Sequence, residues 1–152
     1  MSPFAVSRVS DNIADQIYKL SNGEIDVHGF FFQVMPNDLR HTFKNHENAK
    51  MDSDIPLSEA DMNYAIATIN NGTVEEVQKG KQNSRSVIIS VELPNGRSVE
   101  VYVISKKDGA LALKNMWGIK EDEYQEKYKR RGADTVEDLG PGATPSRTSS
   151  IA

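Results

Sequence analysis

The protein is a chain of 152 residues with a formal net charge of -4 at pH 7, and it contains no cysteine. The length fits one domain with a core large enough to be stable without metal or disulfide support. The lack of cysteine excludes thiolate catalysis, cysteine-ligated zinc and disulfide bonds. No stretch approaches the roughly 18 apolar residues of a membrane span, and the N-terminal sequence has no secretion signal, so we expect a soluble protein.

The charges are unevenly distributed along the chain. From His41 to Gln78 there are seven acidic and two basic residues, whereas from Lys79 to Lys120 there are eight basic and three acidic residues. A locally positive region is what a polyanion-binding protein needs, but it is also typical of an ordinary solvated surface. Both interpretations stay open on charge alone.

The N-terminal part predicts a helix and a short apolar strand. Within Asp11 to Leu20, three apolar residues recur at helical spacing, and Ser, Asn and Gly follow directly as helix-ending residues. The next apolar run, from Phe30 to Val34, has the length of a strand. We expect this run to pair with the sheet or to cover it.

The segment from Leu39 to His46 concentrates two of the three histidines beside an arginine and a lysine. An imidazole titrates near pH ~6.5, so proton-transfer chemistry at neutral pH would begin here. As a helix, the segment would place Leu39, Phe43 and His46 on one face and His41 on the other. His46 is therefore predicted to be structural and His41 to be the better proton-transfer candidate, although a lone exposed histidine is more often inert.

The second half of the chain predicts one more helix followed by a sheet. Residues Glu59 to Asn70 should be helical, because Ser58 and Asp61 have the spacing of a capping box. Four strand-like segments follow, separated by short turn-rich links as in antiparallel hairpins. Their sequences are VEEVQ, SRSVIISVEL, RSVEVYVIS and ALALKNMW. We predict an α+β fold in which N-terminal helices pack on a four-stranded antiparallel meander sheet.

Alternation along these strands predicts which face of the sheet packs on the helices. The apolar face is expected to hold Val87, Ile89, Val91, Leu93, Val99, Val101, Val103, Leu111 and Leu113. The opposite face is expected to hold Ser86, Ser90, Glu92, Ser98, Glu100, Tyr102, Ala110, Ala112 and Lys114. With Glu100, Tyr102 and Lys114 in reach of one another, such a face suits phosphodiester chemistry, whereas a merely solvated face is the commoner outcome.

The C-terminal part predicts a charged helix and a tail. Between Lys120 and Arg131, acidic residues come first and basic residues last, which complements a helix dipole, and we expect a short, loosely docked helix. Residues 132–152 are rich in Gly, Pro, Ser and Thr and should form a disordered tail. The sequence thus divides into a lead-in helix and linker over residues 1–24, a main domain over residues 25–131, and the tail.

Several kinds of site are absent from the sequence. His41 and His46 are five residues apart and do not share a helical face, so no metal site is predicted. The glycines form neither a phosphate-binding loop nor a dinucleotide fingerprint, and a G-x-S-x-G elbow is missing. We therefore expect no cofactor.

The order of these features resembles the phage-associated branch of the barnase, EndoU, colicin and RelE-like (BECR) nucleases, which occur at the C-termini of MuF-type phage head proteins and in polymorphic toxins. The resemblance covers about residues 25 to 120. It rests on an R-H-x(4)-H element beginning at Arg40, an I-P-L-S-x-x-D helix start at Ile55, and an L-x-L-K strand ending at Lys114. It implies a metal-independent endoribonuclease toxin domain over residues 25–131.

The resemblance also implies a reaction, in which the 2'-oxygen of RNA attacks the adjacent phosphorus. Its motifs match Arg40, His41, His46 and Lys114. His41 would act as general acid or base with Glu100 or His46 as its complement, while Arg40 and Lys114 would stabilise the charge of the phosphorane.

Further residues are assigned to substrate binding. The residue after the lysine is Thr or Ser in the family pattern and Asn115 here, whose amide can still donate a hydrogen bond. Tyr102 is a further candidate contact from the sheet. The basic residues expected to steer the RNA backbone are Lys79, Lys81, Arg85, Lys106 and Lys107.

The resemblance implies partners and a place of action as well. RNA is the expected substrate, an immunity or antitoxin protein is an expected partner, and the site of action is cytoplasmic for a phage-encoded or virion-associated protein. Two alternatives remain: a catalytically inactive module that binds RNA or protein, and a structural protein of the phage head.

Overall fold

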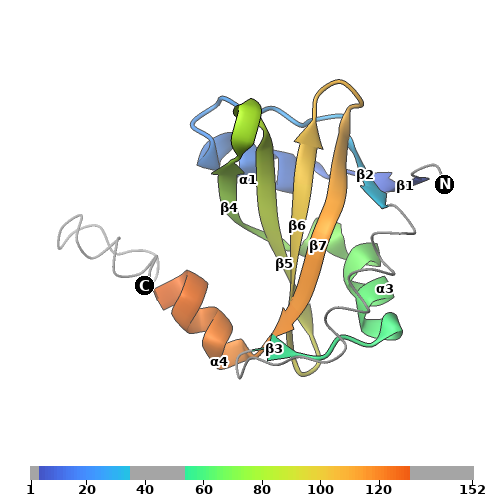
Figure 1. The fold of residues 1–152 in the computed structure, drawn as a ribbon, viewed down its shortest axis with the longest axis vertical. Helices are drawn as coiled ribbons and strands as arrows, with labels where there is room; N and C mark the ends of the chain where they lie inside the picture. The colour runs from blue at the N-terminus through green and yellow to red at the C-terminus, as the bar shows by residue number, and fades with distance from the viewer. Residues whose placement is uncertain (1–3, 35–53, 131–152) are drawn as a thin grey trace.

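The computed structural model describes residues 4–34 and 54–130 (Figure 1). Its centre is a seven-stranded mixed sheet in which six strands follow the order β1-β2-β7-β6-β5-β4, and β3 pairs with β7. Helices lie on both faces of this sheet. The predicted α+β class is therefore confirmed.

The N-terminal elements are β1 (Phe4–Arg8), α1 (Asp11–Leu20) and β2 (Phe31–Val34). The predicted bounds of α1 agree with the structure, and the Ser10 hydroxyl caps the helix by accepting from the amide of Ile13. β1 pairs antiparallel with β2, and β2 pairs in parallel with β7. The apolar run from Phe30 to Val34 therefore pairs with the sheet and does not cover it, which was one of the two predicted alternatives.

Three elements come before β4 in the described chain. They are β3 (Asp54–Ile55), α3 (Glu59–Ala67) and the 3-10 turn η1 (Ile69–Asn71). The predicted capping box is present, with the Ser58 side chain accepting from the Asp61 amide and the Asp61 carboxylate accepting from the Ser58 amide. The α-helix ends earlier than predicted, because its last turn tightens into η1.

The predicted meander is present within the larger sheet. It consists of β4 (Thr73–Lys79), β5 (Arg85–Leu93), β6 (Gly96–Ser105) and β7 (Ala110–Ile119), each antiparallel to the next, with the 3-10 turn η2 (Lys81–Asn83) between the first two. The expected four-stranded sheet is incomplete, because β1, β2 and β3 extend it beyond β7.

The predicted faces of β6 are wrong. The two-residue link after Leu93 pairs that residue with Gly96, and this register sets Ile89 opposite Glu100 and Ser90 opposite Val99. Directly paired residues share a face. Glu100 and its neighbours Ser98 and Tyr102 are therefore on the core face, and the three valines that alternate with them are on the other. Those valines are Val99, Val101 and Val103.

The main core lies between this corrected face and the helices α1 and α3, which contribute Ile13, Ile17 and Met62. Further core side chains come from five of the strands, among them Phe32, Val74, Val87, Tyr102 and Leu113. Because α1 and β2 share this core, no break in packing coincides with the predicted boundary at residue 24.

The opposite face, which we call the outer face, is covered in part by the C-terminal helix. This helix is α4 (Glu121–Tyr124) continued by the π-helical segment η3 (Gln125–Arg130), and Figure 1 shows it running from the end of β7 toward β4. Tyr124 is fully buried against Ile88, Val99 and Ile119. The expectation of loose docking is therefore wrong, because this ring fills a second apolar cluster.

Two sequence predictions lie outside the described residues, namely the helix from Leu39 to His46 and the tail over residues 132–152. In the part of the chain that the structure describes, no helix is long and apolar enough to span a membrane.

Candidate nucleic-acid interface

A groove of about 710 Å³ lies on the outer face between the sheet and the C-terminal helix. We call it the outer groove. The meander supplies most of its lining, through Glu75, Glu76, Gln78, Ile88, Val101, Lys114, Asn115 and Trp117, and the C-terminal helix adds Lys127 and Tyr128. Its lining therefore combines apolar side chains with charged, amide and aromatic groups. Its volume is in the range of small-ligand sites.

Two β-bulges aim charged side chains into the outer groove. In β7, Val101 pairs with Asn115 and Tyr102 with Leu113, so Lys114 is the extra residue. In β4, an equivalent shift leaves Glu75 as the extra residue. Bulges often re-aim side chains beside functional sites. Lys114 is exposed, so its ammonium group is available to a phosphate.

Glu75 already has partners and anchors the C-terminal helix. Its carboxylate accepts hydrogen bonds from the hydroxyls of Tyr124 and Ser90, the second at 2.5 Å, and lies 3.3 Å from the ammonium of Lys129. Burial, followed by the hydrogen bond to this carboxylate, raises the pKa of Tyr124. The Arg97 guanidinium stacks 4.0 Å from the centre of the Tyr124 ring. These contacts fix the helix that carries Lys127 and Tyr128.

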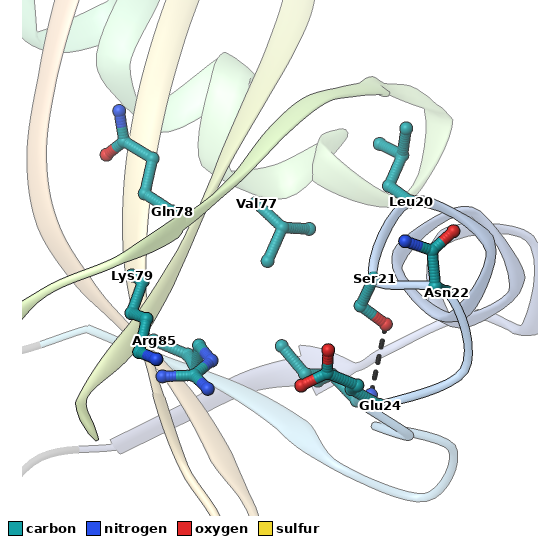
Figure 2. A pocket seen from close by; sticks show the side chains of 9 residues that line it. Leu20, Ser21, Asn22, Glu24, Val77, Gln78, Lys79 and Arg85 are labelled. Atoms are coloured by element: carbon teal, nitrogen blue, oxygen red, sulfur yellow. Dashed lines mark hydrogen bonds between the residues drawn. The ribbon is translucent and has the colours of Figure 1, made fainter.

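A second group of basic residues lies at the far end of the meander. Lys79 and Arg85 are directly paired across β4 and β5 and line a hollow of about 240 Å³ together with Glu24. Figure 2 shows their two head groups side by side, across from the loop that follows α1. Like charges in direct cross-strand pairs are destabilising. In the described part of the chain neither residue forms an ion pair, so this end can accept an anion.

The remaining predicted backbone-steering residues cluster near this end. A neighbouring hollow of about 280 Å³ shares Glu24 and Arg85 with the first and adds Lys106. Lys81 and Lys107 are exposed in the turns beside it. Gln78 lines both the outer groove and the first hollow, so the two regions meet at β4. The structure thus brings together the five basic residues that the sequence singled out, at one end of the sheet.

Glu100 and Tyr102 do not lie in the outer groove. Both are fully buried on the core face, whereas Lys114 lines the outer face, so the predicted grouping of these three residues is wrong. Burial raises the pKa of Glu100 to about 8, although hydrogen bonds from Tyr102 and Ser98 oppose this shift. The cause of the error is the register of β6 described above.

Arg40, His41 and His46 lie outside the described residues. The ends of the segment that carries them can be located, because the described chain stops at Val34 in β2 and resumes at Asp54 in β3. β2 pairs with β7 at residues 110–112, and β3 pairs with it at residues 118–119. The described strands before and after this segment therefore pair with β7 on either side of Lys114.

The remaining histidine, His28, lies elsewhere on the surface. Its Nδ1 is 2.6 Å from the Asp26 carboxylate, and its Nε2 is 2.8 Å from that of Asp15. These hydrogen bonds, the one to Asp26 first, raise the pKa of His28. Across residues 4–34 and 54–130, no three His, Asp or Glu side chains are arranged to hold a metal ion.

Of the ten residues that line the outer groove, the sequence predicted only Lys114 and Asn115 as site residues, and the eight others include Trp117, Lys127 and Tyr128. The sequence contained a signal for Tyr128 and for Trp117. Tyr124 and Tyr128 are four residues apart in an otherwise charged segment, which predicts one aromatic face on that helix. Trp117 is the only tryptophan of the chain and stands in a strand.

Comparisons with protein-family models, with curated proteins and with solved structures find no match to this chain. The function is therefore inferred from the sequence motifs and the site.

Proposed function

We propose that this protein is a metal-independent endoribonuclease whose reaction takes place beside the bulged strand β7. The observation that carries the proposal is that β2 and β3, the strands before and after the segment over residues 35–53, pair with β7 on either side of Lys114. We infer that Arg40, His41 and His46 act beside this strand, whose exposed Lys114 lines the outer groove. In this proposal the acid-base groups and a phosphate-binding cation act beside the same strand.

The proposed reaction is an internal transesterification. One histidine removes the proton of the 2'-OH, the 2'-oxygen attacks phosphorus, and the second histidine protonates the leaving 5'-oxygen. Lys114 and Arg40 stabilise the negative charge of the phosphorane. Because Glu100 is fully buried in the core, we assign it no part in the reaction, and His46 is the complement of His41.

The basic end of the sheet supplies substrate affinity. Its five cations attract the RNA backbone without reading its sequence, and their effect should weaken as salt is added. These are Lys79, Lys81, Arg85, Lys106 and Lys107.

A cleavage assay in EDTA tests the proposal. Purified protein should cut RNA and leave a 2',3'-cyclic phosphate on one product and a 5'-hydroxyl on the other. Activity that strictly requires a divalent ion would overturn it.

The second candidate is an RNA-binding module without catalytic activity. It is favoured by the outer groove itself, whose aromatic and basic groups are complete without the two histidines. RNA binding without any cleavage by the wild-type protein would support this alternative.

A further inference from the structure

We infer that the outer groove binds an unpaired base of single-stranded RNA, and that the C-terminal helix is a functional wall of this site. The inference deepens the proposed function and rests on it, because it names the form of RNA that the same site takes. It uses only residues that the structure describes.

Two aromatic rings from different elements line the groove. Trp117 extends from β7 and Tyr128 from η3, and both are half-buried, so each is held in place while part of it lines the groove. Ile88 and Val101 also line the groove and belong with both rings to one apolar cluster. Stacking of a base on an aromatic ring over an apolar surface is the usual way in which proteins hold unpaired nucleotides.

The charged residues of the groove indicate how a bound RNA strand is oriented. Lys114 and Lys127 line the groove on β7 and on the helix, whereas Glu76 lines it on β4. Glu75, on the same strand, is engaged by Tyr124 and Lys129. The phosphates should therefore run along the two lysines. Glu76 then faces base edges, where a carboxylate can accept hydrogen bonds from amino groups.

A duplex does not fit this arrangement. Paired bases are stacked on one another and present only their edges, so they cannot lie against Trp117 or Tyr128. The site should therefore prefer single strands, and the C-terminal helix should matter because it supplies Tyr128 and Lys127.

The test uses the full chain and a 2'-O-methyl oligonucleotide of about ten nucleotides, which cannot be cleaved because its 2'-oxygen is blocked. Trp117 is the only tryptophan, so its fluorescence reports on the groove directly. The single strand should quench this fluorescence, and the matching duplex should bind about tenfold or more weakly. Equal affinity for the duplex, or binding that leaves Trp117 unchanged, would overturn the inference.

Matched variants test the helix wall. Tyr128→Ala should weaken binding by about tenfold, whereas Tyr128→Phe should retain it, since the ring is kept. Lys127→Gln should lower the salt dependence of binding by about one charge, while Lys19→Gln, on the exposed side of α1, should not. Full affinity in both Tyr128→Ala and Lys127→Gln would refute a role for the helix.

The experiments distinguish failure of this inference from failure of the proposed nuclease function. Binding of the uncleavable strand without cleavage of ordinary RNA would leave this inference standing and refute the nuclease. Cleavage with no dependence on Tyr128 or Lys127 would do the reverse.

Discussion

The hydroxyl of Tyr102 donates a 2.6 Å hydrogen bond to Oε1 of Glu100, and both side chains are fully buried in the core. The Ser98 hydroxyl donates a longer bond of 3.4 Å to the other carboxyl oxygen. Burial raises the pKa of Glu100 to about 8, so this side chain is mostly neutral at pH 7. A carboxyl group in the core thus links two hydroxyls, and in its neutral form one of its oxygens carries a hydrogen that can itself be donated.

Glu100→Gln should change the pH dependence of stability. The native protein holds the Glu100 proton up to about pH 8, whereas the unfolded chain loses it near 4.5, so wild-type stability should fall as pH rises between these values. The glutamine variant lacks this slope, which amounts to at most about 1.4 kcal/mol per pH unit. Urea denaturation from about pH 5 to about pH 9 measures it.

The comparison has an internal control. Near pH 5 the variant should be about as stable as the wild type, because glutamine resembles the protonated acid, and near pH 9 it should be the more stable of the two. Glu59→Gln, at an exposed position of α3, should leave the slope intact. Parallel pH profiles for the wild type and Glu100→Gln would contradict the prediction.

Tyr124→Phe should destabilise the protein by about 1 to 3 kcal/mol. The substitution removes the hydroxyl that donates to Glu75, whose side chain is only 3% exposed, so a buried carboxylate loses one of its donors. Thermal denaturation measures the effect, and Tyr18→Phe on the surface of α1 is the control. An unchanged melting temperature would mean that the contacts from Ser90 and Lys129 are enough to stabilise the buried carboxylate of Glu75.

Local patterns predicted most of the individual elements. The spacing of apolar residues located α1, the capping box at Ser58 located α3, and the turn-rich links located the four strands of the meander. The pairing of β2 with β7 was not specified, because parallel pairing joins residues that are far apart in sequence and leaves no short-range signal. β1 was missed altogether.

The candidate site was predicted only in part. The basic residues predicted to bind RNA do lie near one another, since turns at one end of a meander bring their charges together, and their role stays a prediction. Glu100 was placed on the wrong face because valines alternate with it in β6, and hydrophobicity alone assigned those valines to the main core. In fact Val99 packs under Tyr124, so both faces of β6 are covered and the alternation is ambiguous.

The pKa of His28 should lie above 6.5. Asp26→Asn should lower it more than Asp15→Asn, because the hydrogen bond to Asp26 is the larger cause. NMR titration of the histidine ring protons measures both. Any stabilisation from this surface cluster should be fully present below pH 6.5 and be lost as pH rises through the higher native pKa. Equal shifts in the two variants would contradict the ranking.

Lys114→Gln should reduce RNA cleavage by about 100-fold or more and leave the melting temperature nearly unchanged. The exposed, bulged lysine has little packing to lose, whereas its charge is proposed to stabilise the phosphorane. Single-turnover cleavage at saturating protein separates this effect from binding. Lys19→Gln is the control for a change in net charge. If Lys114→Gln lowers only the affinity for RNA and not the rate of cleavage, Lys114 is a binding residue only.

His41 and His46 should respond differently to substitution. His41→Ala should abolish RNA cleavage and leave the melting temperature nearly unchanged, because an imidazole on the polar face of the predicted helix has little packing to lose. His46→Ala, on the face shared with Leu39 and Phe43, should lower stability by about 1 to 3 kcal/mol and also impair cleavage. Thermal denaturation and cleavage are measured on both variants. The reverse pattern would mean that the active surface is the helix face assigned here to packing, and measurable cleavage unaffected by either substitution would remove both histidines from the reaction.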